Sequence, residues 1–82
     1  MVKEVIRTDN FLRQLKKIDK SMLERVEKLV TKIFRDPEIG KPMRYERKGT
    51  RELYLPPFRL NYVYEKDKDL LIFLDIYHKD KQ

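Results

Sequence analysis

Apolar residues recur at helical spacing in the first half of the chain and alternate with polar residues in the second half. The first helical stripe consists of Phe11, Leu12, Leu15 and Ile18. It predicts a helix capped by Thr8 or Asp9. A second stripe between residues 23 and 34 predicts a helix that starts at a capping box, residues 21–24, and ends at Asp36-Pro37. The two helices are expected to form an antiparallel hairpin with one apolar face, which a sheet must cover.

The remaining segments predict that sheet. Residues 2–7 indicate a charged edge strand, and residues 43–48 a strand that turns at Gly49. Residues 51–55 and 58–64 alternate, and residues 70–77 are apolar on both faces, which is typical of a central strand. We therefore expect a single α+β domain spanning residues 1–82. It should contain an N-terminal strand, the two-helix hairpin and a three- or four-stranded antiparallel sheet packed on the helices.

The period of two also predicts which residues point away from the helices. If Leu70, Ile72, Leu74 and Ile76 face the helices, the residues between them face the open side of the sheet. By this logic the open face gathers Glu52, Tyr54, Arg59, Tyr77 and Lys79. Such a face suits nucleic-acid binding. It equally suits a solvated sheet with cross-strand pairs such as Glu52–Arg59, and periodicity leaves both interpretations open.

The positive charge of the chain is concentrated in one segment. The chain has 20 Lys and Arg against 14 Asp and Glu, a net charge of +6. Residues 41–60 contain six Lys or Arg and two Glu, so +4 of that +6 lies there. Tyrosine and phenylalanine rings alternate with these cations, and cations with rings suit a ligand made of phosphates and flat bases. The charge favours an anionic partner: nucleic acid, an acidic protein segment or a membrane surface.

Composition excludes several classes of protein. The absence of Cys excludes a disulfide scaffold and a thiolate metal site, and is typical of a reducing cytoplasm. A single His argues against a zinc site. No apolar run is long enough to span a bilayer, and residues 1–7 lack the apolar core of a signal peptide. We expect a cytoplasmic protein with no membrane contact, no metal and no small-molecule cofactor.

One motif resembles a known family. The order G-T-R-E-L-Y-x-x-x-F-R-L-x-Y-x-Y in residues 49–64, followed by Y-H-K-D-K in residues 77–81, is similar to the RelE/ParE toxin superfamily. RelE-like members are endoribonucleases that cut mRNA on the ribosome and are held inactive by a cognate antitoxin, whereas ParE-like members poison DNA gyrase. The resemblance implies a toxin whose partners are a small antitoxin and ribosome-bound mRNA, and a metal-independent cleavage by attack of the RNA 2′-hydroxyl. A gyrase inhibitor and a degenerate RNA-binding module are the alternatives.

The resemblance also suggests roles for particular residues. Arg59 matches the arginine that holds the scissile phosphate in RelE-type nucleases, and Lys79 takes the place of a second basic phosphate ligand. In an alignment with the YoeB-like branch, His78 becomes a general-acid candidate, although its parity with Leu74 and Ile76 favours a histidine at the edge of the core. Glu52 and Tyr54 occupy the places of two lysines of RelE, and Met43 replaces a glutamate base.

Cleavage of RNA without a metal needs a base, an acid and cations around the phosphorane. Arg59, Arg51 and Lys79 can supply the cations. Glu52 is either the base or a partner that holds Arg59 in place. The remaining assignments concern binding: Tyr54 and Tyr77 stack on bases or are ordinary strand aromatics, and Arg44 and Lys48 contact phosphates or an acidic antitoxin segment. Apolar residues of the first helix, such as Phe11 or Leu15, are expected in the antitoxin footprint.

Overall fold

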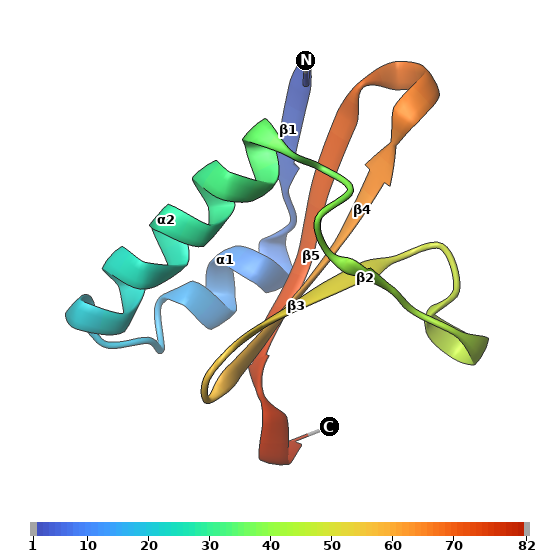
Figure 1. Cartoon of the computed structure of the whole chain (residues 1–82). Coiled ribbons are helices and arrows are strands. Elements are labelled where there is room, and N and C mark those ends of the chain that lie inside the picture. The colour runs from blue at the N-terminus through green and yellow to red at the C-terminus, as the bar shows by residue number, and fades with distance from the viewer. Residues whose placement is uncertain (1, 82) are drawn as a thin grey trace.

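Two helices cover one face of a five-stranded sheet in the computed structural model, which describes residues 2–81 (Figure 1). The helices are α1 (Asp9–Leu15) and α2 (Lys20–Arg35). The strands are β1 (Glu4–Arg7), β2 (Lys41–Pro42), β3 (Arg51–Leu55), β4 (Phe58–Glu65) and β5 (Leu70–His78). Their order across the sheet is β1-β5-β4-β3-β2.

The arrangement confirms the predicted α+β class. β1 lies at the edge and runs parallel to β5, and the other four strands form antiparallel pairs. β5 lies between β1 and β4, as its two apolar faces predict. None of the helices within residues 2–81 is both long and apolar enough to cross a bilayer.

The N-termini of the two helices are capped by different residue types. Thr8 Oγ1 accepts a hydrogen bond from the Phe11 backbone N–H at 3.1 Å, as predicted for the first helix. The capping box predicted at residues 21–24 is wrong. Asp19 is the cap of α2, because its carboxylate accepts from the Met22 N–H at 2.8 Å. That bond, with a second from the Ser21 hydroxyl, lowers the pKa of Asp19.

The segment between β2 and β3 differs from the prediction. Residues 43–48 do not form a strand: β2 covers only Lys41 and Pro42, and a 3-10 turn follows at Tyr45–Arg47. Tyr45 has a φ of 58°, which takes the backbone out of the extended region and ends strand pairing. The turn predicted at Gly49 is confirmed, and its φ of 95° explains why glycine stands there.

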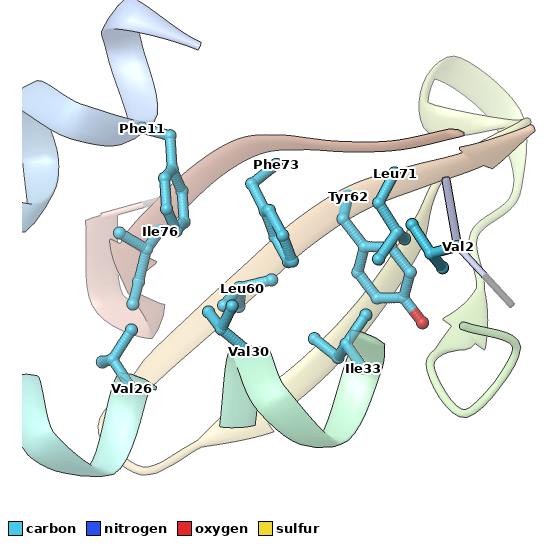
Figure 2. Packing of buried hydrophobic residues seen from close by; sticks show 10 residues of the cluster. All are labelled: Val2, Phe11, Val26, Val30, Ile33, Leu60, Tyr62, Leu71, Phe73 and Ile76. Carbon is cyan, nitrogen blue, oxygen red and sulfur yellow. The ribbon is translucent and has the colours of Figure 1, made fainter. Parts of the chain in front are cut away.

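The core lies between the helices and β4 and β5. Figure 2 shows Val26, Val30 and Ile33 of α2 pointing toward side chains from these strands. The ring of Phe11 stacks on Phe73 with 5.4 Å between the ring centroids. Phe11 is fully buried, so the expectation that it belongs to an antitoxin footprint is wrong. Its burial follows from the helical stripe, which here faces the sheet rather than a partner.

A β-bulge in β5 changes which residues reach the core. Asn61 pairs with Asp75 and the next residue, Tyr62, pairs with Phe73, so Leu74 has no partner in β4. The inward positions are therefore Leu71, Phe73 and Ile76, each at most 1% exposed. The prediction that Leu70, Ile72 and Leu74 face the helices is wrong, because one extra residue reverses the parity of the strand. Beyond the bulge, Ile76 is in the core and Tyr77 faces the open side, as predicted.

The chain between α2 and β3 is anchored to the sheet by two residues. The Tyr62 hydroxyl donates to the Pro37 carbonyl at 2.8 Å and accepts from the Gly40 N–H at 2.9 Å. A Cβ at Gly40 would lie 2.6 Å from that hydroxyl oxygen, so only glycine fits. Arg51 Nη1 donates to the carbonyls of Glu38 and Gly40 at 3.0 and 2.8 Å. These bonds place residues 39–45 along β3, where they form one wall of the groove described below.

Candidate functional site on the open face of the sheet

Polar and aromatic side chains occupy the face of the sheet that the helices leave uncovered. Tyr54 of β3, Arg59 of β4 and Tyr77 of β5 lie in one row, because Tyr54 pairs with Arg59 and Arg59 with Tyr77. Glu52 lies in the neighbouring row, opposite Asn61. Alternation along each strand sends these side chains to the same side, away from the core.

The carboxylate of Glu52 is the centre of this site. Glu52 is 7% exposed and accepts three hydrogen bonds. Arg59 Nη1 donates to Oε1 at 3.4 Å, while Arg47 Nη1 and the Tyr77 hydroxyl donate to Oε2 at 3.2 and 2.7 Å. A buried carboxylate is stable only with such partners. In turn, it fixes two guanidinium groups beside each other on one surface.

Tyr77 links this carboxylate to Arg47. Its hydroxyl donates to Glu52 and accepts from Arg47 Nη1 at 2.7 Å, and the Arg47 guanidinium lies 5.0 Å from the centre of its ring. Burial is the main cause that raises the pKa of Tyr77, and the hydrogen bond to Glu52 adds to it. The phenol is therefore protonated at neutral pH and acts as a fixed donor.

A second cluster forms around the ring of Tyr54. The Arg59 guanidinium lies 5.7 Å and the Lys79 ammonium 5.9 Å from its centre. The Lys79 backbone N–H donates to the Pro57 carbonyl at 2.9 Å, which holds the start of the last turn near the β3–β4 connection. Two cations from separate segments thus converge on one exposed ring. Arg59 Nη2 is left for a further partner, since within residues 2–81 only Nη1 forms a hydrogen bond, whereas Nε is buried without one.

Two predicted site residues lie on the other side of the sheet. Arg51 lies on the same face of β3 as Leu53, toward the helices. Its guanidinium donates to the Glu38 and Gly40 carbonyls and so holds the backbone of that segment in place. His78 pairs with Phe58 across the two strands. Their rings pack edge to face, with 5.8 Å between the ring centroids. His78 Nδ1 accepts from the Asp80 N–H at 3.2 Å. It therefore lies at the edge of the core, as its parity predicts, and not beside Arg59.

The two remaining predicted residues lie in the segment before β3. Arg44 precedes the 3-10 turn and lines a groove, and Lys48 follows the turn as an exposed residue. Between them in sequence, Arg47 contacts Glu52 in the site. The sequence pattern indicated Arg47 only as a member of the basic segment. Periodicity could not find it, because the turn at Tyr45–Arg47 folds the side chain back over the sheet. The one available signal was its place among aromatic and basic residues.

A groove of about 760 Å³ runs beside Arg59. One wall is formed by residues 39–45, and the other by β3 with Arg59 of β4. Its lining includes Lys41, Met43, Arg44, Tyr45 and Tyr54. In the part of the chain that the structure describes, no three His, Asp or Glu side chains cluster so as to hold a metal ion. What the surface offers a ligand is cations and rings, which suits a phosphate with an attached base.

Comparisons with known proteins agree with this architecture. The sequence model of a family described as the ParE toxin of the type II toxin–antitoxin system parDE matches residues 5–82. No curated protein sequence matches the chain. A chain from the crystal structure of the toxin–antitoxin complex RelBE2 from Mycobacterium tuberculosis superposes with a TM-score of 0.85. The two are 26% identical, and the match covers 96% of this chain and 100% of that one.

Two further solved structures share the fold at lower identity. The isolated RelE toxin of E. coli gives a TM-score of 0.79 at 14% identity, over 95% of this chain and 85% of that one. A chain of the RelE–RelB complex from the archaeon Pyrococcus horikoshii gives 0.78 at 15% identity, over the whole of both chains.

Proposed function

The chain belongs to the ParE toxin family of type II toxin–antitoxin systems, within the RelE/ParE superfamily, and we propose that it is an endoribonuclease that cuts mRNA on the ribosome. One observation carries this proposal. Arg59, the residue that matches the phosphate-binding arginine of RelE-like toxins, is held by Glu52 beside Arg47 and shares the ring of Tyr54 with Lys79. Three cations on one open face suit a phosphodiester that gains charge during cleavage.

The reaction is attack of the RNA 2′-oxygen on the adjacent phosphorus. The 2′-hydroxyl loses its proton, a new P–O bond forms, and the P–O5′ bond breaks as the 5′-oxygen takes up a proton. The products are a 2′,3′-cyclic phosphate and a 5′-hydroxyl. Arg59 and Lys79 would contact the non-bridging oxygens, where charge increases in the transition state. Hydrogen-bond donors of this kind contribute about 10²–10³-fold to a rate.

Glu52 serves this proposal as a positioning residue. Both of its oxygens accept from Arg47, Arg59 or Tyr77, and the residue is 7% exposed, so a 2′-hydroxyl has little access to it. Of the two roles that the sequence left open for Glu52, the geometry favours the partner that holds Arg59. Tyr54, half exposed beside Arg59, offers a ring on which a base can stack.

An antitoxin is the second partner that we propose for this chain. The RelBE2 structure is a toxin–antitoxin complex and the archaeal structure is a RelE–RelB complex, and nearly the whole of this chain matches the fold of one chain in each. We infer a small cognate antitoxin that neutralises this chain in the cytoplasm, where ribosomes are its target. An acidic segment that covers Arg47, Arg59 and Lys79 would block phosphate binding by charge complementarity.

Inhibition of DNA gyrase is a second candidate, favoured by a specific observation. The matching family is named for ParE, and the only histidine of the chain lies on the opposite side of the sheet from Arg59. A gyrase inhibitor needs no general acid or base. The open face would then contact an acidic protein surface rather than RNA.

The test compares the wild-type chain with Arg59→Ala in two assays. In a reconstituted translation reaction we expect wild-type protein to cut mRNA and leave 5′-hydroxyl ends, and Arg59→Ala to cut about 10²–10³-fold more slowly. Arg25→Ala is the matched control, because it removes an exposed arginine from α2, on the helix side of the sheet. A supercoiling assay runs in parallel. Inhibited gyrase with intact translation would replace the leading proposal by the second candidate.

A further inference from the structure

Tyr45 is an exposed aromatic residue in an unfavourable backbone conformation. Its side chain is 89% exposed and its φ is 58°, in the left-handed region that bulky residues avoid. The surrounding turn enforces this geometry: the Lys48 N–H donates to the Tyr45 carbonyl at 3.1 Å, and the Thr50 N–H donates to the Arg47 carbonyl at 3.0 Å. Stability alone does not account for such a residue, because asparagine or glycine would adopt the same φ at lower cost and expose less apolar surface. Backbone strain of this kind is concentrated at functional sites.

The ring of Tyr45 belongs to the groove beside Arg59. Tyr45, Met43 and Pro42 line one wall, and Leu53 and Tyr54 line the other. Tyr54 is itself 50% exposed. The groove thus has two accessible tyrosine rings with apolar surface between them. Its volume of about 760 Å³ lies within the usual range for ligand sites, roughly 300–1,000 Å³.

The charges along the groove select an anionic ligand. Three cationic residues line it: Lys41, Arg44 and Arg59. The acidic residue in the lining is Glu52, whose carboxylate is buried and paired with Arg47 and Arg59. Cations and aromatic rings along one groove fit a nucleotide, because its phosphates are anionic and its base can stack on a ring.

We propose that this groove holds the base of an RNA nucleotide next to the phosphate at Arg59, with Tyr45 as its stacking ring. This inference rests on the proposed function for its choice of RNA as the ligand. It adds a residue that determines which RNA segments are held: a base that stacks well on Tyr45 strengthens binding, whereas the cations act on any sequence.

The geometry of β2 explains why the groove is open. β2 pairs with β3 only at Arg51 and Glu52, so within residues 2–81 no strand pairs with the rest of β3 on that edge. The pairing ends before Lys41, because the Gly40 N–H donates to the Tyr62 hydroxyl and not to β3. After Pro42, the Met43 N–H still donates to the Thr50 carbonyl, and residues 43–45 then line the groove together with Leu53 and Tyr54. An acidic peptide strand could pair with the same free edge, and the experiment below distinguishes it from RNA.

The experiment measures binding of short single-stranded RNAs, 2′-O-methylated so that they are not cut, by fluorescence anisotropy. Wild-type protein is compared with Tyr45→Asn, which tolerates the left-handed φ but lacks the ring, and with Tyr45→Phe, which keeps the ring. We expect Tyr45→Asn to lose about fivefold or more in affinity, the lower end of what removal of a stacking ring costs. Tyr45→Phe should bind like wild type. The dependence of affinity on salt should be the same for all three, because no cation is removed.

An abasic RNA provides the internal control. Wild-type and Tyr45→Asn proteins should bind it equally, since it has no base to stack. The thermal midpoint of Tyr45→Asn should equal or exceed that of wild type, because asparagine relieves the strained φ. Equal affinity of Tyr45→Asn and wild type for the intact RNA would overturn the inference.

The remaining outcomes separate this inference from the proposed function. Wild-type protein that binds RNA in a Tyr45-dependent manner but does not cut mRNA would overturn the nuclease proposal and support the groove assignment. Wild-type protein that binds no RNA would overturn the groove assignment. An acidic peptide whose binding weakens in Tyr45→Asn, with RNA binding unchanged, would overturn it too and make the groove a peptide site.

Discussion

The two faces of the sheet use the same strands for different purposes. On the helix-covered face, Leu60 and Tyr62 of β4 are fully buried in the apolar core. On the open face, Arg59 of the same strand takes part in a network of charged and phenolic groups around Glu52. Alternate residues of one strand thus contribute to the core and to the candidate site. Substitutions on the covered face should therefore change mainly stability, whereas substitutions on the open face should also change function.

Two arginines of adjacent strands illustrate the difference between the two faces. Arg51 points to the covered side and donates to backbone carbonyls at residues 38 and 40. Arg59 points to the open side, where a carboxylate holds one of its nitrogens and a ring lies beside the guanidinium. Sequence pattern places both in the same basic segment. Only the direction of the side chain separates a structural arginine from one available to a ligand.

The largest effect is expected in the core. Phe73→Ala should lower the free energy of unfolding by about 3–5 kcal/mol, because the buried ring packs between Phe11 and Tyr62. Ile72→Ala should cost much less, since Ile72 lies on the other face of β5. Urea unfolding followed by circular dichroism measures both. Equal losses would contradict the parity set by the bulge at Leu74.

Glu52→Gln tests whether the open face also contributes to stability. The change removes the negative charge that two guanidinium groups share, so we expect a loss of about 1.5–3 kcal/mol, the range for hydrogen bonds to charged groups. Cleavage should slow as well, because Arg59 loses its anchor. Glu38→Gln is the matched control: its ion pairs with Arg51 and Lys66 are long and exposed, and such pairs contribute about 0–1 kcal/mol. Equal losses in the two variants would show that Glu52 has no special role.

Arg51→Ala and Arg59→Ala should have opposite profiles. Arg51→Ala removes two hydrogen bonds to backbone carbonyls and should cost about 1–2 kcal/mol of stability, with cleavage by the folded protein little changed. Arg59→Ala should change stability less and cleavage far more. Denaturant midpoints and cleavage rates of both variants, measured on the same preparations, check this. A loss of cleavage in folded Arg51→Ala would extend the site to the covered face.

The smallest effect concerns the pH dependence of stability. The pKa of Tyr77 is raised in the folded protein, so its contribution is complete below the normal tyrosine pKa of about 10 and is lost as pH rises through the raised value. Stability of the wild type should therefore fall more steeply above pH ~10 than that of Tyr77→Phe. Tyr62 and Tyr64, whose pKa values are raised mainly by burial, are present in both proteins and cancel in the difference. Parallel curves would mean that Tyr77 ionises as in the unfolded chain.

Much of the architecture follows from local patterns. The apolar stripe of α2 and its end before Pro37 follow from helical spacing and proline sterics. The alternation in β3 and β4 places Glu52, Tyr54 and Arg59 on one face, because the period of a strand is a property of its own backbone. These features depend on residues close to each other in the chain, so they can be predicted without the tertiary structure.

The composition of the site depended instead on contacts between distant segments. The bulge at Leu74 arises where β4 and β5 pair, and it reverses the inward positions of half a strand. Arg47 reaches Glu52 and Tyr77 only because a left-handed residue turns the chain back over the sheet. The same holds for Arg51, whose partners lie in the chain that follows α2. Periodicity determined which residues share a strand face, and tertiary structure decided which of them meet, because register and turn geometry are set by pairing across the whole fold.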